Sequence, residues 1–198
     1  MPTVDFPSRQ PGDEGKIHVT LDGEDRILDR NYYRDSILLP VIQSTTDPQK
    51  LASFLRSGLD DKFGPDLLAD AYRLTTIDPD QEQSYCLYAN ALIQAEDLDR
   101  ASAVLDSYAQ GHPPSPLVNS LRSTIAARKE DYGLALKWAS SVLELDANYP
   151  AGYWRLTTFA KIVGGEELMW QFVELAAGMG SVEAATALAE RGSQSPSS

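Results

Sequence analysis

The chain has 198 residues, of which 42% are hydrophobic and 23% are charged, a composition typical of a soluble globular protein that is long enough to bury a core. Its 29 acidic residues outnumber 17 Lys and Arg, and the net charge of -12 argues against binding to nucleic acid or to an anionic membrane surface. The single cysteine, Cys86, excludes an internal disulfide framework and a metal site made of several cysteines.

The first residues of the chain are rich in Pro, Gly and Asp, and we expect residues 1–15 to form a disordered tail. They lack the basic stretch and apolar core of a secretory signal. No stretch of about 18 apolar residues occurs in the chain, so we expect no membrane-spanning helix. Together these absences predict a cytoplasmic protein.

Residues 16–46 combine a hairpin pattern with a helical one. Three alternating apolar residues precede the pair Asp22-Gly23, which favours a tight hairpin turn: Ile17, Val19 and Leu21. Residues 31–43 then predict a helix that Pro40 ends or kinks. Because a lone hairpin is only marginally stable in water, we interpret 16–46 as a docking segment.

Between residues 47 and 191 apolar residues recur three and four positions apart, which predicts helices throughout. This pattern repeats after 34 residues. Segments 96–108 and 130–142 both open with Glu-Asp, and each has an alanine, Ala101 or Ala135, five residues after that glutamate. Gly and Pro residues separate helices of about a dozen residues, so the repeated unit is a pair of helices.

A unit of this length made of two helices resembles the tetratricopeptide repeat (TPR). The unit 82–115 fits the family pattern of aromatic, large apolar and small residues at seven positions: Tyr85, Tyr88, Ala89, Leu92, Ala101, Leu105 and Pro113. The unit 116–149 fits less well, because Asn119 and Arg122 depart from the pattern.

Two further units complete the resemblance. The unit 150–183 has Met169 where the pattern has alanine, and a degenerate unit spans 48–81. Residues 182–191 are suited to a capping helix, and 192–198 to a flexible tail. The resemblance implies an all-α fold: a TPR-like α-α superhelix of three to four helix pairs with a C-terminal cap, preceded by an extended N-terminal segment that can carry a short β-hairpin.

No group of residues in the sequence predicts catalysis or a metal site. His18 and His112 are far apart in sequence, and we interpret His112 as an exposed loop residue. Cys86 is interpreted as a small buried residue rather than a nucleophile. The acidic stretch 21–29 lacks the ligand pattern of a calcium-binding loop. We therefore expect a protein that is not an enzyme and needs no cofactor or metal.

In the TPR family the first helix of each unit lines a concave groove, and the resemblance implies which residues of this chain face it: Cys86, Leu87, Asn90, Ile93, Leu121, Thr124, Arg128, Trp154, Arg155, Thr158 and Lys161. The set contains three cations and no acid. We expect a mildly basic, partly apolar groove that holds a peptide with some negative charge, with Trp154 as the anchor. In the alternative interpretation Trp154 packs into the core and the arginines lie along apolar surface.

The resemblance implies a protein-interaction module, acting as an adaptor or assembly factor that binds a partner polypeptide. The alternative function is a small acidic TPR chaperone for a secreted or aggregation-prone client, and a third is a structural subunit of a larger complex. A clamp for a C-terminal carboxylate is not expected, because the matching positions lack both lysines of that motif. Homo-oligomers could form through the exposed end of the superhelix, at Met169, Trp170 and Phe172.

Overall fold

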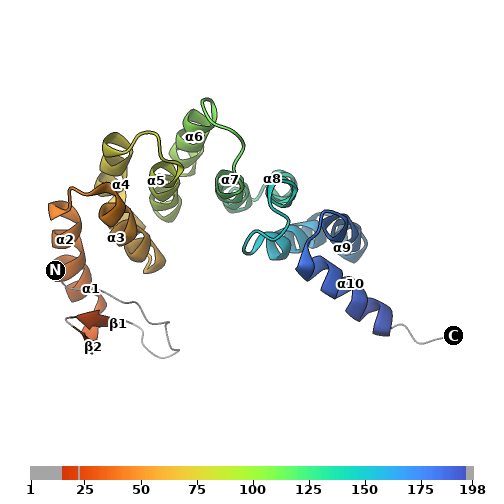
Figure 1. The fold of residues 1–198 in the computed structure, drawn as a ribbon, viewed down its shortest axis with the longest axis horizontal. Coiled ribbons are helices and arrows are strands. Elements are labelled where there is room, and N and C mark those ends of the chain that lie inside the picture. The colour runs from red at the N-terminus through yellow and green to blue at the C-terminus, as the bar shows by residue number, and fades with distance from the viewer. Residues whose placement is uncertain (1–14, 22, 195–198) are drawn as a thin grey trace. The chain divides into compact units, whose positions relative to one another are not determined.

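The computed structural model describes residues 15–21 and 23–194, so the predicted tail lies almost wholly outside the described residues, as do residues 195–198. The chain folds into two compact units, Met1–Glu96 and Asp97–Ser198, and Figure 1 labels their helices and strands. We refer to them as unit 1 and unit 2 and describe each by itself.

Unit 1 begins with the predicted hairpin. Strand β1 (Lys16–Leu21) pairs with strand β2 (Glu24–Asp29) in antiparallel register, with Leu21 opposite Glu24. Gly23 in the turn has a φ of 81°, a value that glycine adopts without strain. The hairpin packs on the helix that follows it, and the Arg30 amide donates to the Gly15 carbonyl oxygen at 2.9 Å. The hairpin prediction is therefore confirmed.

The predicted helix 31–43 is present, and Pro40 does not end it. Helix α1 (Arg30–Tyr33) continues through a π-helical turn, η1 (Arg34–Leu38), into α2 (Leu39–Ser44). The Leu39 amide bonds the Arg34 carbonyl oxygen, five residues back, which widens the helix just before Pro40. Proline cannot donate a backbone hydrogen bond and crowds the preceding turn, so a wider turn at this place relieves the crowding.

The rest of unit 1 consists of three helices: α3 (Pro48–Asp60), α4 (Gly64–Ile77) and α5 (Glu82–Gln94). Helix α3 packs against both α4 and α5, and α4 packs against α5. The Asp47 carboxylate caps α3 by accepting the Lys50 amide at 2.9 Å. Their buried interior is rich in leucine: Leu51, Leu55, Leu59, Leu67, Leu74 and Leu92.

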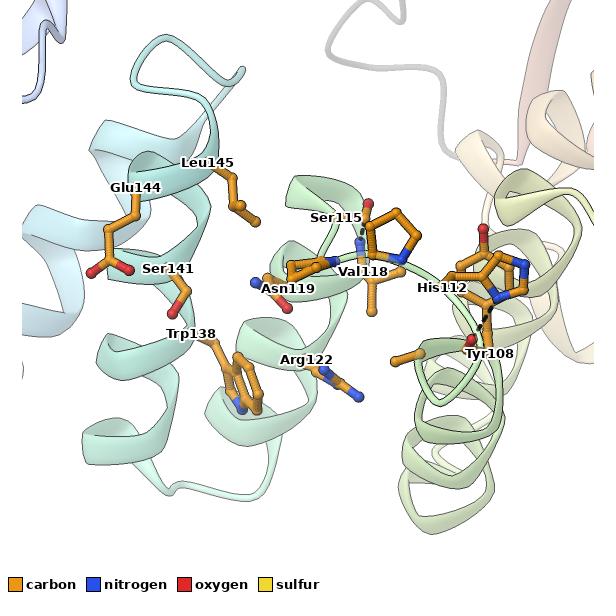
Figure 2. Close-up of a pocket in the computed structure, with 13 residues that line it drawn as sticks. Tyr108, His112, Ser115, Val118, Asn119, Arg122, Trp138, Ser141, Glu144 and Leu145 are labelled. Carbon is orange, nitrogen blue, oxygen red and sulfur yellow. Dashed lines mark hydrogen bonds between the residues drawn. The ribbon is translucent and has the colours of Figure 1, made fainter.

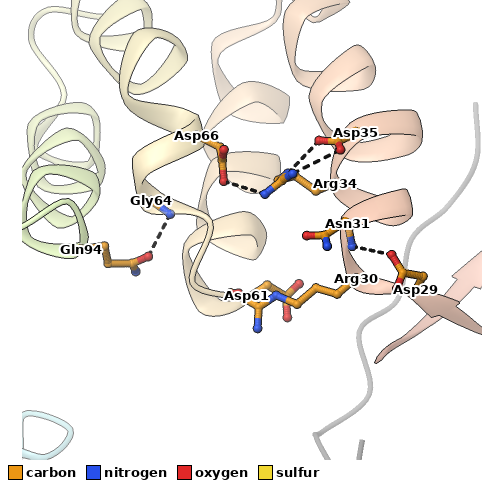
Figure 3. A network of polar contacts seen from close by, with 9 residues as sticks. All are labelled: Asp29, Arg30, Asn31, Arg34, Asp35, Asp61, Gly64, Asp66 and Gln94. Carbon is orange, nitrogen blue, oxygen red and sulfur yellow. Dashed lines mark hydrogen bonds and ion pairs between the residues drawn. The ribbon is translucent and has the colours of Figure 1, made fainter. Parts of the chain in front are cut away.

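A side chain from α5 holds the connection between α3 and α4, as Figure 3 shows in part. The Gln94 amide oxygen accepts the Gly64 amide at 3.0 Å, and the Gln94 amide nitrogen donates to the Leu59 carbonyl oxygen at 2.8 Å. These two bonds satisfy backbone groups at the end of one helix and at the start of the next.

Arginines of the N-terminal segment contact the same connection (Figure 3). Arg30 donates to the Asp61 carbonyl oxygen, and its guanidinium lies 4.6 Å from the centre of the Phe63 ring. Arg34 pairs with Asp66 of α4, at 3.4 Å between Nη1 and Oδ2. Residues 30–34 are therefore joined to the α3–α4 connection by several polar contacts, within unit 1.

In its described residues, 97–194, unit 2 consists of five helices: α6 (Leu98–Ala109), α7 (Pro116–Arg128), α8 (Tyr132–Leu145), α9 (Gly152–Gly178) and α10 (Val182–Gln194). Each packs against the next in chain order. Helix α9 is broken at Gly164 and Gly165, where φ is -141° and 71°, so this glycine pair separates two helical segments. Helix α10 extends three residues beyond the predicted end of the cap.

The 34-residue period is visible in the backbone. Lys62, Glu96 and Glu130 are non-glycine residues with positive φ, at 64°, 61° and 60°, and they follow one another at intervals of 34 residues. Each lies between two helices of a predicted unit. The next unit has Gly165 in this place, 35 residues after Glu130, with φ at 71°. A left-handed residue is a common way to end a helix and reverse the chain.

Small residues allow the helices of unit 2 to approach closely. The hydroxyl of the buried Ser123 on α7 donates to the Ala135 carbonyl oxygen on α8 at 2.9 Å. Three large side chains pack, partly buried, against the core formed by α7 to α10: Met169, Trp170 and Phe172. The Arg191 guanidinium lies 4.2 Å from the centre of the Trp170 ring. These three side chains are therefore partly covered within the protomer, which reduces what they can offer to a second copy.

Candidate functional site

Helix α5 of unit 1 carries four of the predicted groove residues, and three of them are buried. Cys86, Leu87 and Ile93 are 5%, 7% and 4% exposed, whereas Asn90 is half-buried. Burial, with a smaller contribution from Glu82, raises the pKa of Cys86 to about 12, so the thiol stays protonated at neutral pH. Of the four, Asn90 has the side chain that a partner could reach.

The other seven predicted groove residues lie in unit 2. Leu121, Thr124 and Arg128 are on α7; Trp154, Arg155, Thr158 and Lys161 are on the first segment of α9. The Arg155 guanidinium donates to the Ser120 carbonyl oxygen at 3.1 Å and to the Thr124 hydroxyl, which joins the two helices. We call these seven residues the α7–α9 surface.

The cations of the α7–α9 surface have partners within the chain. Arg155 is half-buried, and burial lowers the pKa of its guanidinium. Lys161 is exposed and lies 3.1 Å from the Glu166 carboxylate, from Nζ to Oε1. The surface is therefore less basic than the sequence alone suggests, and for Arg155 the alternative interpretation as a structural residue is supported.

The apolar character of this surface comes from exposed side chains on α9. Trp154 is 64% exposed, so it does not pack into the core. Ile162 follows it on the same side of the helix, after two steps of four residues through Thr158, and is 52% exposed. Val163 is 47% exposed and was not predicted. The exposed apolar stripe formed by Trp154, Ile162 and Val163 ends where Gly164 interrupts the helix.

Unit 2 also has two depressions that the sequence did not predict. The first, of about 430 Å³, lies over α7 between α8 and the C-terminal end of α6 (Figure 2). The second, of about 450 Å³, lies farther along the same helices. Both are lined by Arg122 and Trp138, so the two depressions adjoin at these side chains.

Aromatic and charged side chains shape the first depression. The His112 ring stacks on Tyr108 at 3.9 Å between centroids, and Nδ1 lies 2.7 Å from the Tyr108 carbonyl oxygen. His112 is thus half-buried rather than exposed as predicted. The Arg122 guanidinium lies 4.8 Å from the centre of the Trp138 ring and 2.5 Å from an oxygen of Asp106.

Among the residues that the structure describes, no three His, Cys, Asp or Glu side chains gather as a metal site requires. No helix of the described part of the chain combines the length and the apolar character needed to cross a membrane.

No family model and no curated protein matches the sequence. The structure is similar to the crystal structure of a thermophilic TPR protein from Thermus thermophilus, with a TM-score of 0.61 and 16% sequence identity. The match covers 77% of this chain and 88% of that chain. At this identity the similarity concerns the fold. It confirms that the fold is all-α and TPR-like, with a short hairpin before the helices.

Proposed function

We propose that the protein is a protein-interaction module that binds a segment of a partner polypeptide on the α7–α9 surface. The observation that carries the proposal is the exposure of Trp154, at 64%, on the same face of α9 as the exposed Ile162 about two turns later. Exposed apolar side chains that lie together mark binding surfaces, and tryptophan often dominates the energy of such contacts. The TPR-like fold supports a role in protein binding in general.

The cations on this surface favour a partner with some negative charge. The ion pair of Lys161 with Glu166 is exposed on both sides and is worth less than about 1 kcal/mol, so a carboxylate of the partner can replace Glu166 at little cost. Arg128 lies in the last turn of α7, on the same surface, and is also exposed. The proposed partner segment therefore combines acidic residues with at least one apolar side chain that packs on Trp154.

The biological role that fits such a surface is that of an adaptor or assembly factor without catalytic activity. A second candidate is a small acidic chaperone, which the exposed Ile162 and Val163 favour because they could cover an apolar stretch of a client. A chaperone keeps its client soluble when the two are produced together, whereas an adaptor leaves the solubility of its partner unchanged. Co-expression with an identified partner separates the two roles.

The proposal can be tested with a displayed library of random 12-residue peptides selected on the intact protein. We expect the selected peptides to be enriched in Asp, Glu and apolar residues. A photo-crosslinking amino acid, p-benzoylphenylalanine, placed at Ile162 should capture them, while the same group at Val182 on α10, which is 67% exposed, should not. Equal capture at the two positions would contradict the assignment of the surface.

A further inference from the structure

The two residues of α7 that depart from the repeat pattern both line the first depression of unit 2. Asn119 and Arg122 lie 34 residues before Tyr153 and Leu156 of the next predicted unit, where the side chains are large and aromatic or aliphatic. The preceding predicted unit has tyrosines in the same two places. An asparagine is much smaller than a tyrosine, so the exchange leaves a recess at this place in unit 2.

Asn119 presents its side-chain amide to this recess. The residue is 6% exposed, and its side chain makes no hydrogen bond to any residue that the structure describes. Figure 2 shows the amide on the side of α7 that faces α8, near Ser141 and Leu145. Among the described residues, the Asn119 amide atoms do not belong to the fully buried polar atoms that lack a partner, so they stay open to the recess and a ligand there can bond them.

An amide side chain is well matched to a peptide backbone. Asn119 offers one acceptor and two donor hydrogens, and a peptide group offers one donor and one acceptor. The walls beside it are apolar or aromatic, formed by Val118, Leu145 and the Tyr108–His112 stack. The recess can therefore hold one apolar side chain while the amide bonds the backbone next to it.

The two depressions together are elongated. We call the two depressions together the trough. It follows α7 from Val118, next to Asn119, to Lys129, and α6 and α8 lie on either side of it. Eleven helical steps span about 16 Å, the length of about five residues of an extended chain. An extended peptide fits this form better than a compact small molecule.

Charge decides which peptide fits the trough. Arg122 is paired with Asp106 at 2.5 Å, and Lys129 with Asp99 at 2.5 Å, so both cations are already neutralised. Two more carboxylates line the trough, Asp131 and Glu144. The remaining charge is negative, which disfavours an acidic segment and favours a neutral or basic one.

We infer that the trough is a second binding site, for an extended stretch of about five residues of a partner protein that is neutral or basic and carries an apolar side chain. Asn119 bonds the backbone of this stretch. The site differs from the α7–α9 surface in its residues and in the charge of its partner, so it does not depend on the proposed function.

The test is a displayed library of random nine-residue peptides, selected on the intact protein and then counter-selected against the variant Asn119→Tyr. This substitution restores the residue type of the neighbouring units and fills the recess. Selected peptides should bind the wild-type protein and lose at least tenfold in affinity for Asn119→Tyr, measured by fluorescence polarisation. Their affinity for Trp154→Ala should change less than twofold, which separates this site from the α7–α9 surface.

Circular dichroism and thermal unfolding establish whether Asn119→Tyr is folded. If it is not, Ser141→Phe fills the recess from α8 and is expected to give the same loss. The inference is overturned if the selection yields no peptide that distinguishes the wild-type protein from the filled variant. It is also overturned if the distinguishing peptides are predominantly acidic, or if a small molecule alone binds at Asn119.

Discussion

Arg155 on α9 donates hydrogen bonds to the Ser120 carbonyl oxygen and to the Thr124 hydroxyl on α7. The resemblance to TPR proteins places Arg155 among the residues that face a ligand, yet its guanidinium joins the first helices of two successive predicted units. A half-buried guanidinium that bonds neutral acceptors contributes to stability first, and only its remaining donors are available to a partner.

Replacing Arg155 should therefore destabilise unit 2. Arg155→Ala removes both hydrogen bonds and the packing of the side-chain stem, and we expect it to lower the free energy of unfolding by about 1–3 kcal/mol. Lys161→Ala is the matched control: Lys161 is exposed and pairs with an exposed Glu166, so its loss should cost no more than about 0.5 kcal/mol. Urea denaturation compares the two, and equal effects would show that the Arg155 contacts are not stabilising.

Gly64 at the start of α4 tolerates no side chain. A Cβ atom there would lie 2.5 Å from Cβ of Gln94, so Gly64→Ala must displace Gln94 and break its bonds to the Gly64 amide and the Leu59 carbonyl oxygen. We expect a loss of about 2 kcal/mol in the free energy of unfolding.

The control for this substitution is Gly133→Ala in the first turn of α8. There the nearest atom to a new Cβ is Oδ1 of Asp131 at 3.8 Å, an ordinary contact. Alanine favours the helix over glycine, so this variant should be as stable as the wild type or more stable by up to about 1 kcal/mol. If Gly64→Ala behaves in the same way, Gln94 does not hold the α3–α4 connection as described.

The thiol of Cys86 should be unreactive in the folded protein. Its pKa is raised from 9.0 to about 12, chiefly by burial, so at pH 8 the folded state has on the order of a thousandfold less thiolate than the unfolded chain. We expect labelling by a thiol reagent to be slower by a similar factor until denaturant is added. Rapid labelling under native conditions would show that α5 exposes Cys86 and would return it to the accessible part of the predicted groove.

The same pKa shift links stability to pH. Below pH 9 the Cys86 thiol keeps its proton in both the folded and the unfolded protein, so the full free energy of unfolding is retained. As the pH rises toward 12, the unfolded thiol ionises before the folded one, and the free energy of unfolding falls. In Cys86→Ala, the part of the fall in the free energy of unfolding at alkaline pH that comes from this thiol should disappear. Denaturation at a series of pH values measures it.

Much of the fold could be predicted because it depends on local patterns. Helix pairs follow from apolar spacing, and the recurrence of a left-handed residue at Lys62, Glu96 and Glu130 follows from the period. The hairpin follows from alternating apolar residues before Asp22-Gly23. The continuous helix through Pro40 could not be predicted, because the π-helical turn that accommodates proline leaves no mark in the sequence.

The candidate site could be predicted only in part, because exposure depends on packing between distant segments. The family pattern indicates which residues share a helix face, but it does not show that Cys86, Leu87 and Ile93 are covered in unit 1. It does not reveal that Lys161 is paired with Glu166 either. The signal for the trough was present, since Asn119 and Arg122 depart from the pattern, but a departure alone does not tell a recess from a repacked core.

The central claim is that Trp154 anchors a partner polypeptide, and the most direct test is the affinity of the library-selected 12-residue peptides for Trp154→Ala. Tyr32→Ala is the control, because Tyr32 is an exposed aromatic residue at 56% on α1 of unit 1. We predict a loss of at least about tenfold for Trp154→Ala, as expected for an aromatic anchor, and less than about twofold for Tyr32→Ala. Equal affinity of both variants and the wild-type protein would contradict the account.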